Sequence, residues 1–447
     1  MKIACSIHGV VDLARWVLRG DGGVAATVQT LLSRLLILVI NIVTGVITAR
    51  ILGSEGRGEQ AALILWPQFL AYSITLGLPS ALLYNMRRYS EQKSKLISAA
   101  LVITGGLGLI ATAIGIIFIP QWLDQYSLEV VRQAQQFMVM SPLILISTTL
   151  LAALEAENEF TLTNRMRYLM PLATLTMLGA LALTKSLTPW TAGLTYLLPT
   201  IPITLWLLAH FWKRFRFVWY DLGKAYKLLT SYGIRSYGVD LVNILAMQLD
   251  QVLVVGLLSP TSMGMYAVTL SLSRMMIILQ NAIVTVLFPK AVNRSKEDVV
   301  ALTGQAARLS MVLLIPIAVT IIWLGPILLG WFYGTEFLGA VLLLRLLVVE
   351  ALISSLVWIL AQAFMALGRP GTATLLQGLG LGISVPIMLL LIPVYGLEGI
   401  GFALLLSTTV RLFFVLINFP LSLKVNPPSL IVTQEDWHFL KRELLKI

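Results

Sequence analysis

The chain has 447 residues, of which 58% are apolar and only 12% are charged, and its mean hydropathy is +0.87. A soluble domain carries roughly twice that charged fraction, so the composition excludes a soluble globular protein and predicts an all-α polytopic membrane protein. The single cysteine, Cys5, excludes a disulfide framework and a cysteine-based metal site. The net charge of +11 does not indicate nucleic-acid binding, because the basic residues lie in short connections between apolar runs.

Residues 1–27 are predicted to form a cytoplasmic or interfacial segment. They do not resemble a signal peptide, since no long apolar core precedes a small-residue cleavage site. Asp12, Arg15 and Arg19 share one helical face, which favours an amphipathic helix lying on the membrane surface. A poorly ordered extension is the alternative.

About twelve apolar runs follow, each long enough to cross a bilayer as a helix. The predicted spans are 28–49, 60–85, 96–119, 134–157, 168–184, 189–211, 231–257, 264–289, 306–331, 338–366, 371–393 and 397–419. The segment between the sixth and seventh runs is both basic and aromatic, which predicts a helix in the headgroup layer. The predicted domains are therefore a six-helix bundle over 28–212, an interfacial linker helix over 213–230, a second six-helix bundle over 231–420 and a cytoplasmic tail over 421–447.

The charge pattern predicts the orientation in the membrane. Most of the 32 lysines and arginines fall on one side of the predicted spans. The opposite side has only Arg50, Arg57, Arg132 and Lys185. Because basic loops stay in the cytoplasm, both termini are predicted to be cytoplasmic, which agrees with an even number of spans.

The two halves of the chain resemble each other. Leu52–Gly58 (LGSEGRG) and Leu258–Gly264 (LSPTSMG) each end a first span and open a second. An even number of spans in each half gives the halves the same orientation, so the pattern predicts two pseudo-symmetric bundles related by an axis along the membrane normal.

The seventh predicted span carries polar residues where a membrane helix is normally apolar. Asp240, Asn243, Asp250 and Gln251 fall within roughly a third of a helical turn of one another. A charge near the bilayer centre costs about 2.5–3.5 kcal/mol, so these side chains are expected to face a partner or a water-filled cavity. A buried polar pair that locks this helix to its neighbours is the alternative.

The first predicted span has a polar stripe of its own, which includes Arg34 and Asn41. At the repeat offset, Arg34 corresponds to Asp240. The hypothesis is that these two opposite charges help to close the cytoplasmic side when the cavity faces outward. The alternative is that each charge pairs within its own bundle and gates nothing.

Several segments together resemble one family. These are ARILGSEGRGEQAALILWP at positions 49–67, YGIRSYGVDL and LDQVLVVGLLSPTSMGMYAV in the seventh span and after it, and FMALGRP after the tenth. In this order and at this spacing they are similar to bacterial oligosaccharide flippases. These are the O-antigen and polysaccharide-unit exporters of the multidrug/oligosaccharidyl-lipid/polysaccharide superfamily. The resemblance covers residues 28 to 420.

The resemblance implies that the chain moves undecaprenyl-pyrophosphate-linked sugars across the bacterial inner membrane by alternating access, for polysaccharide or O-antigen biosynthesis. Its partners would then be the lipid-linked oligosaccharide, membrane lipids and, as further candidates, the polysaccharide polymerase and the chain-length machinery. Neither enzymatic activity nor a cofactor is expected, and the cycle is compatible with coupling to a proton or sodium gradient.

If the chain is such a flippase, a pyrophosphate must cross the membrane. Arginine is suited to bind the pyrophosphate, because the planar guanidinium holds phosphate oxygens bidentately. Arg274 is the preferred candidate, since it lies near mid-depth of the eighth span and shares a face with Asn281. The predicted substrate-path residues are Arg34, Asn41, Asn243, Gln251, Arg274 and Asn281.

Asp240, Asp250 and Glu350 are the predicted coupling or gating residues. They either neutralise nearby arginines or take up the protons or cations that drive the cycle. For Glu350 a structural pairing is an open alternative, and its partner would lie on another helix because Arg345 points well away from it. No metal site is predicted.

The rival functions are a lipid II flippase and an ion-coupled drug exporter of the same superfamily. The former typically has additional spans, and the latter is expected to have an acidic rather than an arginine-bearing cavity. A membrane scaffold is the remaining alternative, but a scaffold does not need the polar stripes.

Overall fold

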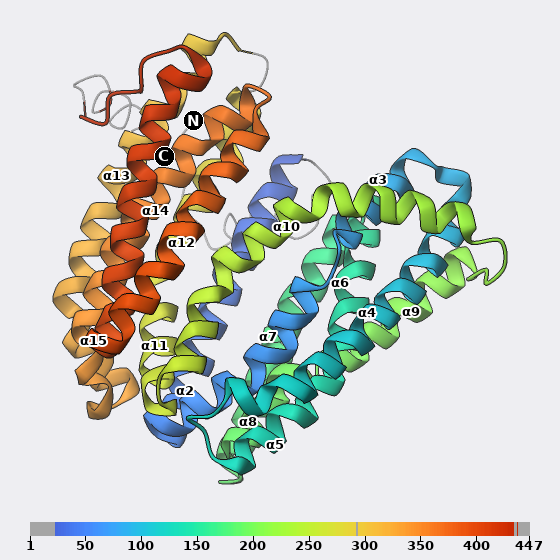
Figure 1. Ribbon diagram of the computed structural model, residues 1–447, viewed down its shortest axis with the longest axis horizontal. Helices are drawn as coiled ribbons and strands as arrows, with labels where there is room; N and C mark the ends of the chain where they lie inside the picture. The colour runs from blue at the N-terminus through green and yellow to red at the C-terminus, as the bar shows by residue number, and fades with distance from the viewer. Residues whose placement is uncertain (1–22, 292–293, 433–435, 437–447) are drawn as a thin grey trace, which may run out of the picture. The chain divides into compact units, whose positions relative to one another are not determined.

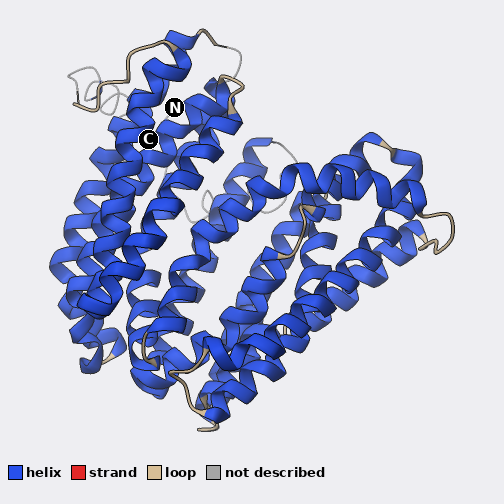
Figure 2. Cartoon of the chain, viewed as in Figure 1, coloured by secondary structure: helices blue, strands red, loops and turns tan. Residues whose placement is uncertain are grey.

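The computed structural model describes residues 23–291, 294–432 and 436. In these residues every regular element is a helix and none is a strand (Figure 2), which confirms the all-α prediction. The predicted interfacial segment 1–27 lies almost entirely outside the described residues. The end of the predicted tail 421–447 also lies outside them.

Nine helices in the described part of the chain are long and apolar enough to span a membrane. Two of them each consist of two helices joined at a glycine with positive φ. Helix α2 (Gly23–Ser73) has this joint at Gly53 (φ 71°), and α15 (Pro370–Asn418) has it at Gly396 (φ 56°). Glycine adopts this conformation without the steric penalty that a Cβ atom imposes. Each of the twelve predicted ranges is mostly helical, but residues 74–77 interrupt the second range, 60–85, and the number of membrane crossings stays a prediction.

The chain divides into two compact units. In the described residues, unit 1 extends as far as Thr48 and also includes Leu63–Gln121 and Leu128–Asp240. Unit 2 comprises Ala49–Ala62, Trp122–Ser127 and the chain from Leu241 onwards. Along the chain, the boundary between the two units falls within α10 (Gly223–Leu257), so the polar stretch predicted for this helix is divided, with Asp240 in unit 1 and Asp250 in unit 2.

Unit 1 is organised around α6, which packs against α3 and α9. Besides parts of α2 and α10, its helices are α3 (Leu78–Arg88), η1 (Ser90–Gln92), α4 (Lys93–Trp122), α5 (Leu128–Phe137), η2 (Met138–Met140), α6 (Ser141–Ala156), α7 (Phe160–Leu183), α8 (Pro189–Leu197) and α9 (Thr200–Phe215). The core contains fully buried Leu82, Met86, Leu150 and Phe211. Between helices in a bilayer, contacts of this kind are stabilised by close van der Waals packing rather than by removal of the side chains from water.

Three glutamates at the turn between α6 and α7 pair with basic residues of other helices. The pairs are Glu155–Arg167 (2.6 Å), Glu157–Lys93 (2.6 Å), Glu157–Arg214 (2.9 Å) and Glu159–Arg214. Networks of this kind hold helix ends together better than isolated surface pairs do. This network connects α4, α7 and α9 at the side that the charge pattern predicts to be cytoplasmic.

The predicted linker helix over 213–230 is not a separate element. Helix α9 continues to Phe215, residues 216–222 form a loop, and α10 begins at Gly223. The loop lies against the start of α4, where Lys95 pairs with Asp221 at 2.5 Å and Ser98 Oγ accepts from the Val218 amide at 2.9 Å. The hydrogen bond and the charge of Lys95 hold the pKa of Asp221 below its usual value.

Besides parts of α2 and α10, the helices of unit 2 are α11 (Pro260–Ser273), α12 (Met275–Ala291), α13 (Lys296–Ile327), η3 (Leu328–Tyr333), η4 (Thr335–Ala340), α14 (Val341–Ala366), α15 and η5 (Phe419–Leu423). The unit is organised around α14, which packs against α11, α12, α13 and α15 (Figure 1). The core includes Leu360 and Phe364 of α14 and Phe419 of η5, all fully buried.

The two repeated turns of the sequence pack on each other within unit 2. A Cβ atom on Gly58 would lie 1.7 Å from the carbonyl oxygen of Pro260, and one on Gly264 would lie 1.8 Å from that of Ser54. The contact is reciprocal, because each glycine faces the carbonyl group that lies four residues before the other glycine. Only glycine permits two backbones to approach so closely.

The C-terminal tail is attached to the start of α13. Arg308 donates from Nε to Asp436 Oδ2 at 2.6 Å, from Nη2 to Asp436 Oδ1 at 3.1 Å and from Nη1 to the Ser429 carbonyl at 2.9 Å. Pro428 packs over Gly304, where a Cβ atom would lie 2.6 Å from the proline Cβ. The Asp436 side chain is only 1% exposed, so the pair is a buried, bidentate one.

Asp436→Asn is expected to destabilise unit 2. The substitution leaves the Arg308 guanidinium without its carboxylate, and losing one partner of a buried ion pair costs about 3 kcal/mol or more. Thermal unfolding of the purified protein in detergent should show a Tm several degrees lower than that of the wild type. Glu297→Gln, which removes an exposed carboxylate near the start of the same helix, is the control; equal Tm values for all three proteins would contradict the assignment.

Candidate functional site

Asp250 is enclosed between two helices of unit 2. The chain turns within two residues after α10, and Ser259 caps α11 while Pro260 opens it, so that α11 returns beside α10. This return brings the Tyr266 hydroxyl, which is completely buried, to donate a hydrogen bond to Asp250 Oδ2. The other carboxylate oxygen, Oδ1, is buried and has no hydrogen-bond partner among the described residues. A buried acceptor of this kind is costly and therefore marks a site rather than ordinary packing.

Arg274 lies beside this carboxylate. It occupies the break between α11 and α12, and its Nη2 donates to the Met247 carbonyl at 2.9 Å. Its charge interacts with that of Asp250. Asp250 and Arg274, predicted as a coupling residue and a substrate-path residue, are thus brought together in one cluster.

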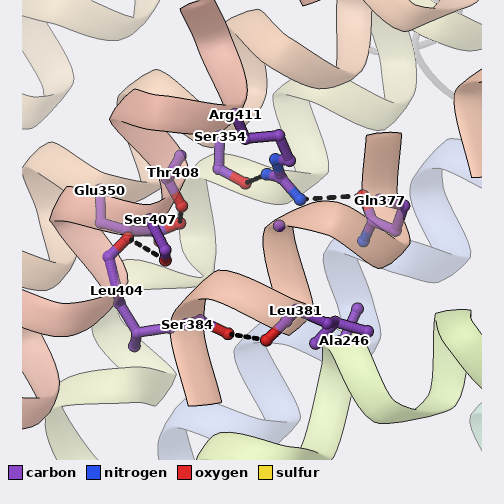
Figure 3. Close-up of a pocket in the computed structure, with 11 residues that line it drawn as sticks. Ala246, Glu350, Ser354, Gln377, Leu381, Ser384, Leu404, Ser407, Thr408 and Arg411 are labelled. Carbon is purple, nitrogen blue, oxygen red and sulfur yellow. Dashed lines mark hydrogen bonds between the residues drawn. The ribbon is translucent and has the colours of Figure 1, made fainter. Parts of the chain in front are cut away.

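A polar cavity lies between α14 and the two halves of α15 (Figure 3). Its volume is about 120 Å³, and since one water needs roughly 10–15 Å³ measured in this way, it has room for several waters. Its lining includes five hydroxyl or amide side chains, together with one acid and one arginine. These polar lining residues are Glu350, Ser354, Gln377, Ser384, Ser407, Thr408 and Arg411.

The two charged residues of this cavity bind neutral partners. Glu350 Oε1 accepts from the Thr408 hydroxyl at 2.7 Å. Arg411 donates from Nη1 to Gln377 Oε1 at 2.8 Å and from Nη2 to Ser354 Oγ at 3.0 Å (Figure 3). No direct salt bridge joins Glu350 and Arg411 in the part of the chain that the structure describes. The hydrogen-bond partner of Glu350, Thr408, lies on another helix, α15, and is a neutral hydroxyl rather than a charged group.

The Asp250–Arg274 pair and the Glu350–Arg411 pair form one electrostatic cluster. The charge of Glu350 interacts with those of Arg411, Asp250 and Arg274. Two carboxylates and two guanidiniums balance formally, which is how ionisable groups persist in an apolar bundle. A proton or cation that binds one carboxylate would change the electrostatic field at the other three groups.

Gly380 makes room for Arg411. A Cβ atom at this position would lie 2.8 Å from Arg411 Cδ. The glycine therefore lets the aliphatic part of the arginine cross the helix backbone, so that the guanidinium reaches Gln377 and Ser354. Its role here is close packing rather than helix bending.

The remaining predicted site residues lie outside this cluster. Asn41 and Asn243 are exposed, and Gln251 donates to the Met247 carbonyl at 3.3 Å. Asn281 is half-buried on α12, and Asp240 accepts from the Ser80 hydroxyl at 3.1 Å. The backbone of Arg34 is helical, but the structure does not describe its side chain. The Arg34–Asp240 pair therefore stays a prediction.

Sequence reasoning missed Ser354, Gln377 and Thr408 as site residues. Helical spacing offered a signal for two of them: Ser354 follows Glu350 by four positions, and Thr408 precedes Arg411 by three, so each pair shares a helix face. Hydroxyl residues are common in membrane helices, and the spacing does not reveal which other helix a face meets.

Residues 24–293, more than half of the chain, match the family model described as polysaccharide biosynthesis protein. No curated protein matches the chain significantly.

Three solved structures show the same fold. The lipid II flippase MurJ in an inward closed conformation has a TM-score of 0.74 and 15% identity, with 90% of this chain and 88% of that chain covered. An inward-facing multidrug resistance MATE family transporter of the MOP superfamily has a TM-score of 0.70 and 14% identity, with 93% and 99% covered. A MOP superfamily transporter from Pyrococcus furiosus has a TM-score of 0.61 and 16% identity, with 92% and 98% covered. The chain belongs to the polysaccharide biosynthesis protein family and has the fold of MOP superfamily transporters.

Proposed function

We propose that the protein is a flippase that moves undecaprenyl-pyrophosphate-linked oligosaccharide units across the bacterial inner membrane by alternating access. The observation that carries this proposal is the family match over 24–293, in a chain with nine apolar helices of spanning length in its described residues. The shared fold with a flippase and with exporters supports transport rather than catalysis. Both termini would be cytoplasmic, and the polymerase and chain-length machinery would act on the exported units.

The substrate path would use the arginine and amide side chains named from the sequence: Arg34, Asn41, Asn243, Gln251, Arg274 and Asn281. Arginine would hold the pyrophosphate, and the amides would hydrogen-bond to sugar hydroxyls. Arg274 supports this role through its position at a helix break, where one of its amino groups is already oriented by the Met247 carbonyl.

Coupling would depend on the carboxylates. Asp250 and Glu350 would take up a proton or a sodium ion in unit 2, and Asp240 would act in gating from unit 1. The Oδ1 atom of Asp250, which has no hydrogen-bond partner among the described residues, and the polar cavity at Glu350, which has room for several waters, support this assignment, since an ion needs both an available oxygen and a polar route to it.

A lipid II flippase is the second candidate, because the chain has the same fold as the lipid II flippase MurJ. Both substrates carry a lipid pyrophosphate, so the phosphate chemistry is shared and the sugar distinguishes them.

Deleting the gene in its own bacterium and complementing it tests the proposal. We expect loss of surface polysaccharide and accumulation of lipid-linked units on the cytoplasmic side, both reversed by the wild-type gene. Growth arrest that a known lipid II flippase rescues, with surface polysaccharide unchanged, would identify the second candidate instead.

A further inference from the structure

Two arginines on neighbouring helices of unit 1 have no carboxylate partner in the described part of the chain. Arg88 is the last residue of α3, and Arg235 lies on α10; both are exposed. Arg88 Nη1 donates to the Tyr84 hydroxyl, and Arg235 Nη2 donates to Ser231 Oγ at 3.3 Å. Neither arginine forms an ion pair with any described residue. Most of their guanidinium donors are therefore available to a ligand.

A pair of stacked tyrosines orders the surface between them. The rings of Tyr84 and Tyr232 stack with centroids 4.3 Å apart and an interplanar angle of 16°. Arg88 follows Tyr84 by four residues and Arg235 follows Tyr232 by three, so each arginine emerges on the same helix face as its tyrosine. The Arg88 guanidinium also lies over the rings of Tyr84 and Tyr89, at 5.8 and 5.7 Å, which restricts its rotamers before any ligand binds.

The backbones beneath this surface are in close contact. Helix α10 crosses α3 (Figure 1), and a Cβ atom on Gly77 would lie 2.3 Å from the Gly233 carbonyl oxygen. One on Gly233 would lie 2.6 Å from the carbonyl oxygen of Leu76. Asn85 Nδ2 also donates to the Leu228 carbonyl at 3.4 Å. The tyrosine pair and its two arginines thus stand on a fixed crossing of two helices, a suitable base for a binding site.

Arg87, the residue before Arg88, does have partners, so an arginine at this end of α3 can be hydrogen-bonded to neighbouring helices. Arg87 donates to the Glu155 carbonyl at 2.7 Å and to Asn158 Oδ1 at 3.3 Å. It therefore belongs to the α6–α7 turn, whose three glutamates are all paired with other basic residues. Arg88, one position later, points to the tyrosines instead.

We propose that Arg88, Arg235 and the Tyr84–Tyr232 pair form a docking site for the pyrophosphate headgroup of the lipid-linked substrate. The proposal rests on the proposed function and adds a place of first contact, on the side predicted to be cytoplasmic. Two guanidiniums around one aromatic pair match a pyrophosphate, because each planar fork binds phosphate oxygens bidentately. The exposed part of the tyrosine pair offers a flat face to the first sugar, as aromatic rings do in sugar sites.

Binding of farnesyl pyrophosphate to the purified protein in phosphatidylcholine nanodiscs tests this site. We expect Arg88→Gln and Arg235→Gln each to raise the Kd about tenfold, which corresponds to about 1.4 kcal/mol. Arg88→Lys should recover part of the loss, because it restores the charge without the fork. Arg87→Gln is the matched control and should bind as the wild type does. All three substituted residues, Arg87, Arg88 and Arg235, are exposed at the surface, so the variants should fold normally.

Three results would overturn the docking site: no binding by the wild type, an unchanged Kd in both Gln variants, or an equal loss in Arg87→Gln. Nanodiscs with added phosphatidylglycerol distinguish binding of the substrate pyrophosphate from binding of an anionic lipid headgroup. Displacement of farnesyl pyrophosphate by phosphatidylglycerol at similar concentrations would make this a general anionic-lipid surface and reject the substrate assignment. If the Gln variants export polysaccharide normally while gene deletion abolishes export, the docking site fails and the flippase function stands.

Discussion

Replacing Gly264 with alanine is expected to prevent the protein from accumulating in folded form. The new methyl group would lie 1.8 Å from the Ser54 carbonyl oxygen and 2.8 Å from its carbon. Both are backbone atoms, so no side chain can rotate away, and the α11 backbone must move as a whole. Overpacking a core typically costs 1–3 kcal/mol, and we expect a backbone collision to reach or exceed the top of this range, about 3 kcal/mol. Fluorescence-detected size exclusion of a tagged protein measures the folded fraction.

Gly382→Ala is the control for this experiment, because nothing lies within 4 Å of a Cβ atom at that position on α15. It should accumulate as the wild type does, or slightly better, since alanine favours helix over glycine by about 1 kcal/mol. Gly58→Ala should repeat the Gly264 defect, given its 1.7 Å approach to the Pro260 carbonyl oxygen. Normal accumulation of both the Gly58 and Gly264 variants would show that the two repeated turns do not pack as described.

Asp250→Asn is expected to lower export of lipid-linked units at least tenfold while the protein still inserts and folds. The asparagine keeps the shape and can still accept the Tyr266 hydrogen bond, but it removes the charge opposite Arg274 and the oxygen that would take up an ion. Surface polysaccharide in a complemented deletion strain, normalised to the amount of membrane protein, is the measurement. Asp124→Asn, in an exposed turn, is the control. Full export by Asp250→Asn would remove Asp250 from the mechanism.

A double substitution separates the two roles of this carboxylate. If Asp250 only neutralises Arg274, its effect depends on the arginine, so Asp250→Asn should cause no further loss of export when it is added to Arg274→Gln. If Asp250 carries the coupling ion, Asp250→Asn should lower the residual export of Arg274→Gln by a further factor similar to that seen in the wild type. We expect the second result, since Asp250 Oδ1 has no hydrogen-bond partner among the described residues, whereas a purely structural counter-ion would have both oxygens satisfied.

Helix positions were predictable because length and hydropathy determine them directly. The repeated turns were also readable, and Gly58 and Gly264 do meet. The linker over 213–230 was misread because basic and aromatic residues occur equally in interfacial helices and in interfacial loops. Its composition therefore did not reveal the loop at 216–222.

The candidate site was only partly predictable, for a different reason. Asp250 and Arg274 stood out as charges in apolar runs, and so did Glu350. Their neighbours depend on which helices pack together: Thr408 is 58 residues from Glu350, and Asp436 is 128 residues from Arg308. Helical periodicity describes one helix at a time, so contacts across such separations emerge only from the folded chain.

The most direct test of the flippase account is translocation of a labelled undecaprenyl-pyrophosphate-linked oligosaccharide in proteoliposomes that contain only the purified protein. The account predicts that the wild type moves the label to the opposite leaflet well above the rate in protein-free liposomes. It also predicts that Asp250→Asn reduces that rate at least tenfold. Translocation by the wild type no faster than in protein-free liposomes, under every proton and sodium gradient applied, would contradict the account.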